Sequence, residues 1–205
     1  MLFIRCAYNE NMNTTDLTPE THAAAIAVAA QTFRVLETGD ARLAFATASP
    51  SFRNQEAFVS PSAASLPGPA GLLASSAWMR SAFSGLTFTV TDAAYDGGKV
   101  WLRLRMSGLH TGAFVRYTDG KLEQAIAPTG RRIDFEQIHV LEVVDGLVVG
   151  HEAVRDDVTM LGQLGVFPPT PGGMARMIGW AVSGKAKRAA ASVSAAADAA
   201  AATAL

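Results

Sequence analysis

Three ionisable residues, His139, Glu152 and Asp156, have the side-chain types that general acid/base chemistry requires. They lie on either side of Asp145-Gly146, and an Asp-Gly pair between apolar, β-branched runs is typical of a two-residue hairpin turn. Such a turn sets the register and places His139 opposite Glu152. Because side chains alternate along a strand, both share one mostly apolar face, and Asp156 joins them if no bulge intervenes. Burying ionisable groups on such a face is costly, so they are expected either to pair with each other or to serve a function.

This polar group has two interpretations. In the first, His139 and Glu152 form a cross-strand ion pair, and Asp156 or Asp157 caps the helix that follows. In the second, the group lies at the floor or rim of a pocket and supplies a general acid or base. The hairpin by itself leaves both open. In this register His151 lies on the opposite face, so a two-histidine site would require a β-bulge.

The composition favours a globular protein that acts on a small molecule. With 205 residues, 49% of them hydrophobic, the chain can bury a core and form one domain with appendages. A formal net charge of -1 gives no reason to expect nucleic acid or an anionic membrane as the main partner. The single cysteine, Cys6, excludes an internal disulfide. We find no signal peptide and no stretch long enough to span a bilayer, so we expect a cytoplasmic protein.

The order of the expected elements predicts an α+β domain over residues 18–168, after a loose leader over residues 1–17. Helices are expected from Thr18 to Gly39, after Asp40, and from 72 to 83. From residue 86 onward the period changes to two, which predicts a run of antiparallel strands, with His110 on the apolar face. Residues 113–130 are expected to form a loop. N-terminal helices packed on a curved antiparallel sheet leave room for a cone-shaped pocket.

The tail, residues 169–205, differs in character from the domain. An apolar stripe over residues 174–182 is expected to pack on the domain or on a second subunit. The alanine-rich run after Gly184 offers little to bury, so we expect a frayed helix or disorder there.

Motifs of several other enzyme classes are missing from the sequence. It contains no P-loop, dinucleotide-binding glycine motif, H-E-x-x-H helix, G-x-S-x-G elbow or Cys/His zinc cluster. The four histidines do not have metal-ligand spacing, so we expect no metal. If the chain is an enzyme, acid/base chemistry without a cofactor is the favoured class.

Several sequence patterns, in their order and spacing, resemble the SnoaL-like polyketide cyclases, or ester cyclases, of the nuclear transport factor 2-like superfamily. The resemblance runs from about Thr21 to Pro168. Its patterns are FRNQEA, GPAGLLASSAWMRSAF, SGLHTGAF, PTGRR and HEAVRDDVTMLGQLG. It implies a cone-shaped α+β barrel and a homodimer formed through the outer face of the sheet.

The resemblance also implies a mechanism. Asp156 occupies the position of an aspartate that acts as general acid/base in an intramolecular aldol closure, which needs no metal or organic cofactor. His139 and His110 are candidate hydrogen-bond donors to the developing oxyanion. Asn54 matches a family asparagine that could reach the pocket mouth. Glu152 stands where the family has tryptophan, which makes it a candidate substrate contact and a second candidate for the acid/base role.

The function hypothesis that follows is a cyclase or isomerase acting on a polyketide-like or other carbonyl-rich small molecule. The alternative is a non-catalytic small-ligand-binding or dimerisation domain of the same fold. A hydrolase or dehydratase on this scaffold is a third option, because a fold does not determine its chemistry.

Overall fold

The computed structural model describes residues 19–205. The expected leader, together with Cys6 and the expected N-cap Thr18, lies outside the described residues. The elements observed are α1 (Pro19–Thr38), α2 (Ala41–Thr47), β1 (Ala48–Asn54), the 3₁₀ turns η1 (Gln55–Val59) and η2 (Ser62–Ser65), α3 (Gly68–Ala82), β2 (Phe83–Asp96), β3 (Lys99–His110), β4 (Phe114–Thr118), β5 (Lys121–Ile126), β6 (Arg132–Val144), β7 (Leu147–Arg155), α4 (Asp157–Leu164), α5 (Pro171–Val182) and α6 (Lys185–Ala202).

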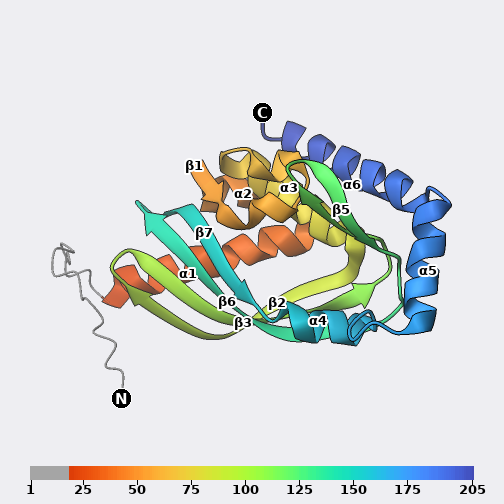
Figure 1. The fold of residues 1–205 in the computed structure, drawn as a ribbon. Helices are drawn as coiled ribbons and strands as arrows, with labels where there is room; N and C mark the ends of the chain where they lie inside the picture. Colours follow the sequence, from red (N-terminus) through yellow and green to blue (C-terminus); the bar gives the residue numbers. More distant parts are fainter. Residues whose placement is uncertain (1–18) are drawn as a thin grey trace, which may run out of the picture.

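The first helices begin and end at the residues that the local signals indicate. Gly39 follows α1 with a φ of 72°, the left-handed conformation that commonly ends a helix. Asp40 caps α2, because its carboxylate accepts the backbone N–H groups of Arg42 and Leu43. Together with α3, these helices cover one face of a curved sheet, and α1 lies along that sheet in Figure 1.

The main sheet has the strand order β1-β7-β6-β3-β2, and every neighbouring pair is antiparallel except β1 with β7, which is parallel. The predicted α+β class with helices on a curved sheet is therefore confirmed. The parallel strand β1 was not predicted, because its segment reads as a polar connector between helices. β3 follows the predicted alternation, with Leu102 and Leu104 fully buried and Trp101 46% exposed.

The segment expected to be a loop over residues 113–130 instead contains a second, two-stranded sheet made of β4 and β5. Asp119 and Gly120 form its turn with φ angles of 51° and 71°. This is the same Asp-Gly signal that marks the β6–β7 turn. Phe114, Tyr117 and Ile126 are buried, so this small sheet is part of the core. The prediction of a loop was wrong because polar residues break up the apolar pattern of both strands.

The β6–β7 hairpin has the predicted turn but not the predicted register. Val144 pairs with Leu147, and Val143 pairs with Val148. The next pair is Glu142 with Gly150, so Val149 is an extra residue and the hairpin contains a β-bulge. Beyond this bulge every pairing is displaced by one residue, and the predicted register there is wrong.

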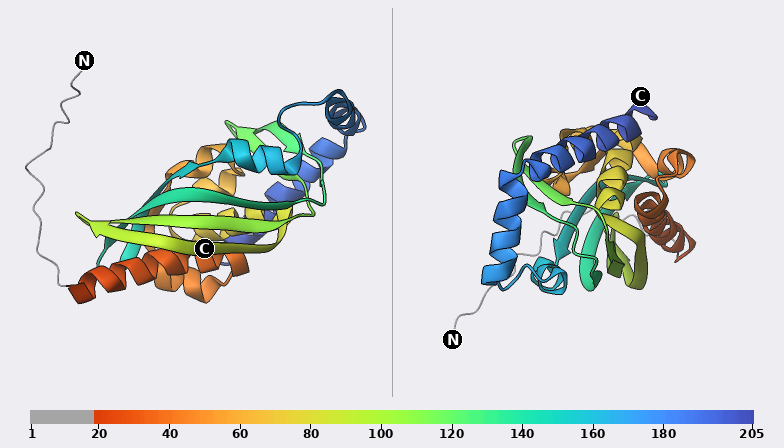
Figure 2. Two further views of the ribbon diagram at one scale, coloured as in Figure 1. Left: turned by 90° about the horizontal axis from the view of Figure 1, so that it is seen from below. Right: turned by 90° about the vertical axis from the view of Figure 1, so that its right-hand side faces the viewer.

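The alanine-rich tail forms an ordered helix, contrary to the expectation of fraying or disorder. Its buried residues repeat at helical spacing and are Ala186, Ala190, Val193, Ala197 and Ala201. Ala197 and Ala201 pack against alanines of η1, η2 and α3, on the side of α3 away from the main sheet (Figures 1 and 2), while Ala190 and Val193 belong to the core around Phe114 and Tyr117. Small side chains allow the two helix backbones to approach closely, so an alanine face can contribute dispersion contacts without large apolar groups. The Tyr117 hydroxyl donates to the Ala190 carbonyl oxygen at 2.9 Å.

Helix α5 joins α4 to α6 at one end of the sheet (Figure 2). Met177 and Trp180 of its apolar stripe pack against the core, while Met174, Ile178 and Val182 are exposed. None of the helices in residues 19–205 combines the length and apolar character needed to cross a membrane.

The close packing of α6 gives a stability prediction. Ala197 is fully buried, so Ala197→Gln should lower the free energy of unfolding by about 1 to 3 kcal/mol, because a larger polar side chain has no space there. Ala196 is exposed on the same helix, and Ala196→Gln is the matched control that should change stability by less than about 0.5 kcal/mol. Urea unfolding of the full chain measures both. Equal stabilities would show that α6 does not pack as described.

Candidate active site

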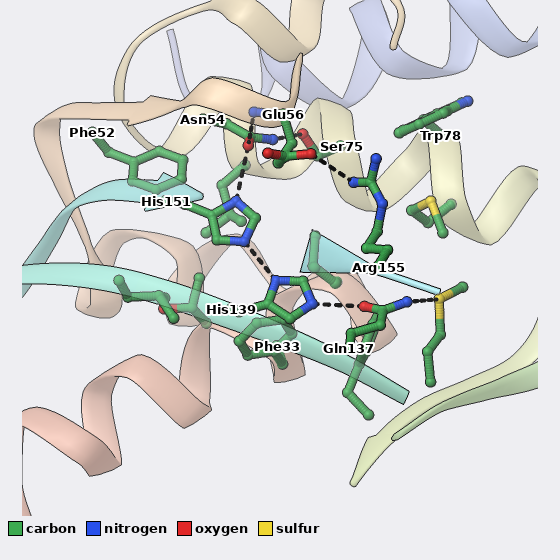
Figure 3. A pocket seen from close by; sticks show the side chains of 17 residues that line it. Phe33, Phe52, Asn54, Glu56, Ser75, Trp78, Gln137, His139, His151 and Arg155 are labelled. Atoms are coloured by element: carbon green, nitrogen blue, oxygen red, sulfur yellow. Dashed lines mark hydrogen bonds and ion pairs between the residues drawn. The ribbon is translucent and has the colours of Figure 1, made fainter. Parts of the chain in front are cut away.

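A cavity of about 80 Å³ lies between the main sheet and helices α1 and α3. Most of its wall is apolar, and the aromatic part consists of Phe33, Phe52, Trp78 and Phe88. Its polar groups come together on one side, from β1, η1, β6 and β7 (Figure 3). They are Asn54, Glu56, Gln137, His139, His151 and Arg155, and Thr32 of α1 and Ser75 of α3 are the other polar residues of the wall.

Four of these side chains form a continuous chain of hydrogen bonds (Figure 3). Asn54 Oδ1 lies 2.9 Å from His151 Nδ1. His151 Nε2 lies 2.7 Å from His139 Nδ1, and His139 Nε2 lies 2.6 Å from Gln137 Oε1. The bulge at Val149 makes this chain possible, because it pairs His151 with Leu141 and turns the His151 side chain toward the cavity. Two histidines from different strands thereby come into direct contact.

Asn54 determines which nitrogen of each histidine donates in the hydrogen-bonded chain. Its Oδ1 accepts the backbone N–H of Glu56 at 3.0 Å, and its amide nitrogen donates to Ser75 Oγ at 3.4 Å. The oxygen therefore faces His151, whose Nδ1 must carry the proton of their hydrogen bond. His151 Nε2 is then an acceptor when the ring is neutral, so His139 Nδ1 is the donor between the two rings. The remaining lone pair of the neutral pair lies on His139 Nε2.

The number of protons in the chain determines which group of the Gln137 amide faces His139. With oxygens at both ends, the chain has three hydrogen bonds and needs three protons, whereas two neutral imidazoles supply two. The arrangement with Gln137 Oε1 toward His139 thus suits a pair that has taken up one proton. With a neutral pair, the Gln137 amide has to present its NH₂ group to His139 Nε2. Turning the amide gives up only a weak N–H···S contact with Met106 at 3.3 Å.

Burial keeps this pair neutral at ordinary pH. His139 is 4% exposed, and the edge-on contact of its ring with Phe33 has a centroid separation of 4.8 Å. Burial, followed by repulsion from His151 and Arg155, holds the pKa of His139 well below its ordinary value of 6.5. Burial, followed by repulsion from Arg155, lowers the pKa of His151 to about 4. The pair therefore offers an unprotonated imidazole nitrogen near pH 7.

Arg155 is the cation next to the pair, and two carboxylates hold it in place. Arg155 Nη1 lies 3.1 Å from Glu56 Oε2, and Arg155 Nε lies 3.5 Å from Asp157 Oδ1. Glu56 also accepts the backbone N–H of Ala153 at 3.2 Å, which ties η1 to β7. Within residues 19–205, no cluster of three or more His, Cys, Asp or Glu side chains could hold a metal ion.

The candidate residues named from the sequence are divided between this cavity and other places. His139 and Asn54 line the cavity. His110 is fully buried as expected, but it lies outside this lining. Its Nδ1 lies 3.0 Å from Thr129 Oγ1, its ring packs on Phe83, and burial lowers its pKa to about 4. The proposed contact of His110 with substrate stays a prediction.

The bulge removes the other two residues from the inner face. Glu152 pairs with Val140 in the ladder, and its exposed side chain accepts a hydrogen bond from Gln55 Nε2 at 3.4 Å. The predicted adjacency of Glu152 and His139 was therefore wrong. Asp156 is exposed and caps α4, with its carboxylate accepting the Thr159 N–H at 3.0 Å and the Thr159 hydroxyl at 2.6 Å.

The capping interpretation of Asp156 is thus confirmed, while the acid/base role implied for it by the resemblance stays a prediction. The hydrogen bonds from Thr159 lower the pKa of Asp156, which is the opposite of the raised pKa that a base in an apolar pocket would have.

Sequence reasoning missed His151, Gln137, Glu56 and Arg155 as site residues. His151 was assigned to the outer face because the bulge leaves no clear sequence signal. The available hint for Glu56 was its place beside Asn54 in the pattern FRNQEA. Arg155 lies one residue before Asp156 and was not predicted as a site residue, because the predicted register placed it on the outer face of the sheet.

Comparisons with known proteins agree with this fold. Residues 26–164 match the family described as SnoaL-like polyketide cyclase. The chain is 32% identical over 110 residues to the aklanonic acid methyl ester cyclase DauD of Streptomyces sp. (strain C5), a match covering 53% of this chain and 62% of DauD. The cyclase DnrD of Streptomyces peucetius, which has the same activity in its name, is also 32% identical over 110 residues, 53% of this chain and 69% of DnrD.

Among solved structures, TsrD from Streptomyces laurentii has a similar fold, with a TM-score of 0.57 and 23% sequence identity. The similarity covers 71% of this chain and 97% of TsrD.

The buried histidines make acid lability a testable property. Between pH 6.5 and 5 the unfolded chain takes up protons that the folded protein excludes, so stability should fall as pH falls, with a slope that rises to about 1.4 kcal/mol per pH unit for each such histidine near pH 5. His139→Gln should reduce this slope by about one proton. Leu141→Val, on the same strand face, should lower stability but keep the slope. Urea unfolding across this pH range tests both, and an unchanged slope in His139→Gln would contradict the assigned burial of a neutral imidazole.

Proposed function

Because the chain belongs to the SnoaL-like polyketide cyclase family, we propose that it closes a ring in a polyketide-like, carbonyl-rich small molecule by an intramolecular aldol-type reaction, with His139 as the base. The observation that carries this proposal is the hydrogen-bonded chain from Asn54 to Gln137, whose neutral form leaves His139 Nε2 without a proton on the polar side of the cavity. A buried polar chain of this kind is costly to maintain, and such groups concentrate at functional sites.

In the proposed reaction, the Gln137 amide first moves away from His139 Nε2, because this nitrogen has a single lone pair. His139 Nε2 then removes a proton from a substrate carbon that lies between two carbonyl groups. The resulting enolate carbon attacks a second carbonyl carbon of the same molecule, and a carbon–carbon bond forms. The oxygen of the attacked carbonyl then takes the proton from the His139 imidazolium, so the product has the same atoms as the substrate. No metal or organic cofactor is required, since the conjugated substrate delocalises the enolate charge.

His151 would stabilise the protonated form of His139 while the enolate exists. The new Nε2–H points to the substrate, so the Gln137 amide returns to His139 Nε2 only after the product has left. His151 continues to accept from His139 Nδ1 and is held by Asn54. Arg155 lines the same cavity and could stabilise the negative charge of the enolate.

The depressed histidine pKa also favours a particular class of substrate. A buried imidazole is reliably unprotonated at neutral pH, but it is a weaker base than an exposed one. Proton removal by such a base is feasible only from a carbon that is already acidic. A carbon flanked by two carbonyl groups meets this condition, and polyketide chains contain many. DauD and DnrD are named as aklanonic acid methyl ester cyclases, so aklanonic acid methyl ester is a rational first probe.

The catalytic prediction compares two candidate bases. His139→Gln should lower kcat for cyclisation of aklanonic acid methyl ester by at least about 100-fold, the usual loss for a general base. Asp156→Asn should keep activity within a few-fold, because asparagine is as good an N-cap as aspartate. His22→Gln, which changes a histidine stacked on Tyr95 outside the cavity, is the control. Chromatography of substrate and product follows the reaction, since closure leaves the mass unchanged.

The opposite result is equally informative. Full activity in His139→Gln together with its loss in Asp156→Asn would assign the base to Asp156 and overturn the role of His139. Binding of the probe by the wild-type protein without any turnover would support the non-catalytic ligand-binding alternative.

A further inference from the structure

A second cavity adjoins the first one. Its volume is about 50 Å³, and it shares with the first cavity the wall residues Trp78, Met79, Met106, Gln137 and Arg155. Beyond this shared wall it extends between the main sheet and the small β4–β5 sheet, where Arg116 is the additional charged group from β4. Gln137, at the end of the hydrogen-bonded chain, faces both cavities. A ligand longer than the first cavity would therefore reach the second by passing Gln137.

Arg116 differs from the other arginine in this wall because it has no ion-pair partner within the part of the chain that the structure describes. Its Nε is buried and makes no hydrogen bond among residues 19–205. Arg155, in contrast, is paired with both Glu56 and Asp157. Arg116 is half-buried, and a buried N–H without an acceptor is costly, so a ligand oxygen that accepted from Nε would remove that cost.

The charges around the second cavity favour an anionic ligand group. Arg116, Arg155 and Asp157 line it, so the wall has two cations and one anion. The anion is already engaged by Arg155 at 3.5 Å. The rest of the wall is largely apolar, including Phe114, Phe135 and Met160. A positive group in apolar surroundings attracts an anionic oxygen more strongly than it would in water.

We infer that Arg116 anchors an anionic oxygen at one end of a planar, conjugated substrate, whose body extends past Gln137 into the first cavity. Suitable groups are a carboxylate, a phenolate or the enolate of a 1,3-dicarbonyl unit, all of which accept hydrogen bonds from a guanidinium group. The inference deepens the proposed function and rests on it for the location of the reaction. Arg116 would determine which end of the substrate enters first, while His139 removes the proton.

Ligand binding to the full-length protein tests this role without any requirement for turnover. The probes are 2-naphthoate and its neutral analogue 2-naphthamide, and the measurement is Kd by titration calorimetry. Wild-type protein should bind 2-naphthoate at least about tenfold more tightly than 2-naphthamide, a difference of about 1.4 kcal/mol. Arg116→Met should abolish this preference and leave the Kd for 2-naphthamide within about twofold. Arg132→Met, the same change at an exposed strand residue, should keep the preference.

Three results would overturn the inference. They are equal affinity of the wild-type protein for both probes, binding of neither probe, and an unchanged preference in Arg116→Met. The comparison of probes on wild-type protein stays decisive even if Arg116→Met fails to fold. His22→Gln, a change outside both cavities, should bind 2-naphthoate like the wild-type protein. If the preference for 2-naphthoate depends on Arg116 but the protein has no cyclase activity, the role of Arg116 is supported and the proposed function is refuted. Failure of the Arg116 inference can therefore be distinguished from failure of the proposed function.

Discussion

One extra residue in one strand decides the chemistry of this cavity. Val149 forms a β-bulge in the β6–β7 hairpin, and every side chain of β7 beyond it changes face. Without the bulge, Glu152 would point inward next to His139. With it, His151 and Arg155 point inward, and Glu152 points out to Gln55. The cavity thus contains a pair of neutral imidazoles where a carboxylate and an imidazole would otherwise lie.

The presence of His151 instead of Glu152 beside His139 changes the protonation states that the cavity favours. A buried carboxylate beside a histidine would favour the charged form of both groups. Two histidines in contact disfavour charge on each other, and burial among Phe33 and other apolar side chains adds to this effect. The pair consequently remains neutral, and Asn54 determines which nitrogen has the free lone pair. A base whose position and protonation are both determined suits the removal of an acidic C–H proton.

Charge is distributed unevenly along the wall that the two cavities share. Arg155 lies beside the histidines, and Glu56 and Asp157 neutralise it, so it lowers the histidine pKa values without leaving a buried cation unpaired. Arg116 lies farther along and has no such partner within the described part of the chain. The arrangement gives the site a proton-accepting end and an anion-binding end, with Gln137 between them. An elongated substrate with an acidic carbon and an anionic oxygen matches both ends.

Local patterns in the sequence determined much of this protein. The period-two alternation of β3, the Asp-Gly turn and the Asp40 cap were all readable, because each depends on residues close together in the chain. The order of helices and strands indicated the α+β fold, the hairpin turn brought His139 forward, and the family pattern brought Asn54 forward as a site residue. The small sheet of β4 and β5 was not predicted because polar residues interrupt its apolar pattern, and the packing of α6 was not predicted because its buried face consists mainly of alanine. Both depend on contacts with distant elements.

The identity of the inward-facing residues on β7 was decided only by the tertiary structure. A β-bulge has no reliable local signal, since the strand accepts the extra residue wherever packing on both faces is improved by it. A shift of one residue reverses the face of every side chain that follows, so a small uncertainty in register became a complete change in the predicted site. The sequence by itself determined that ionisable groups would lie in this hairpin. Packing of the sheet against α1 and α3 decided that the inward pair would be His139 and His151.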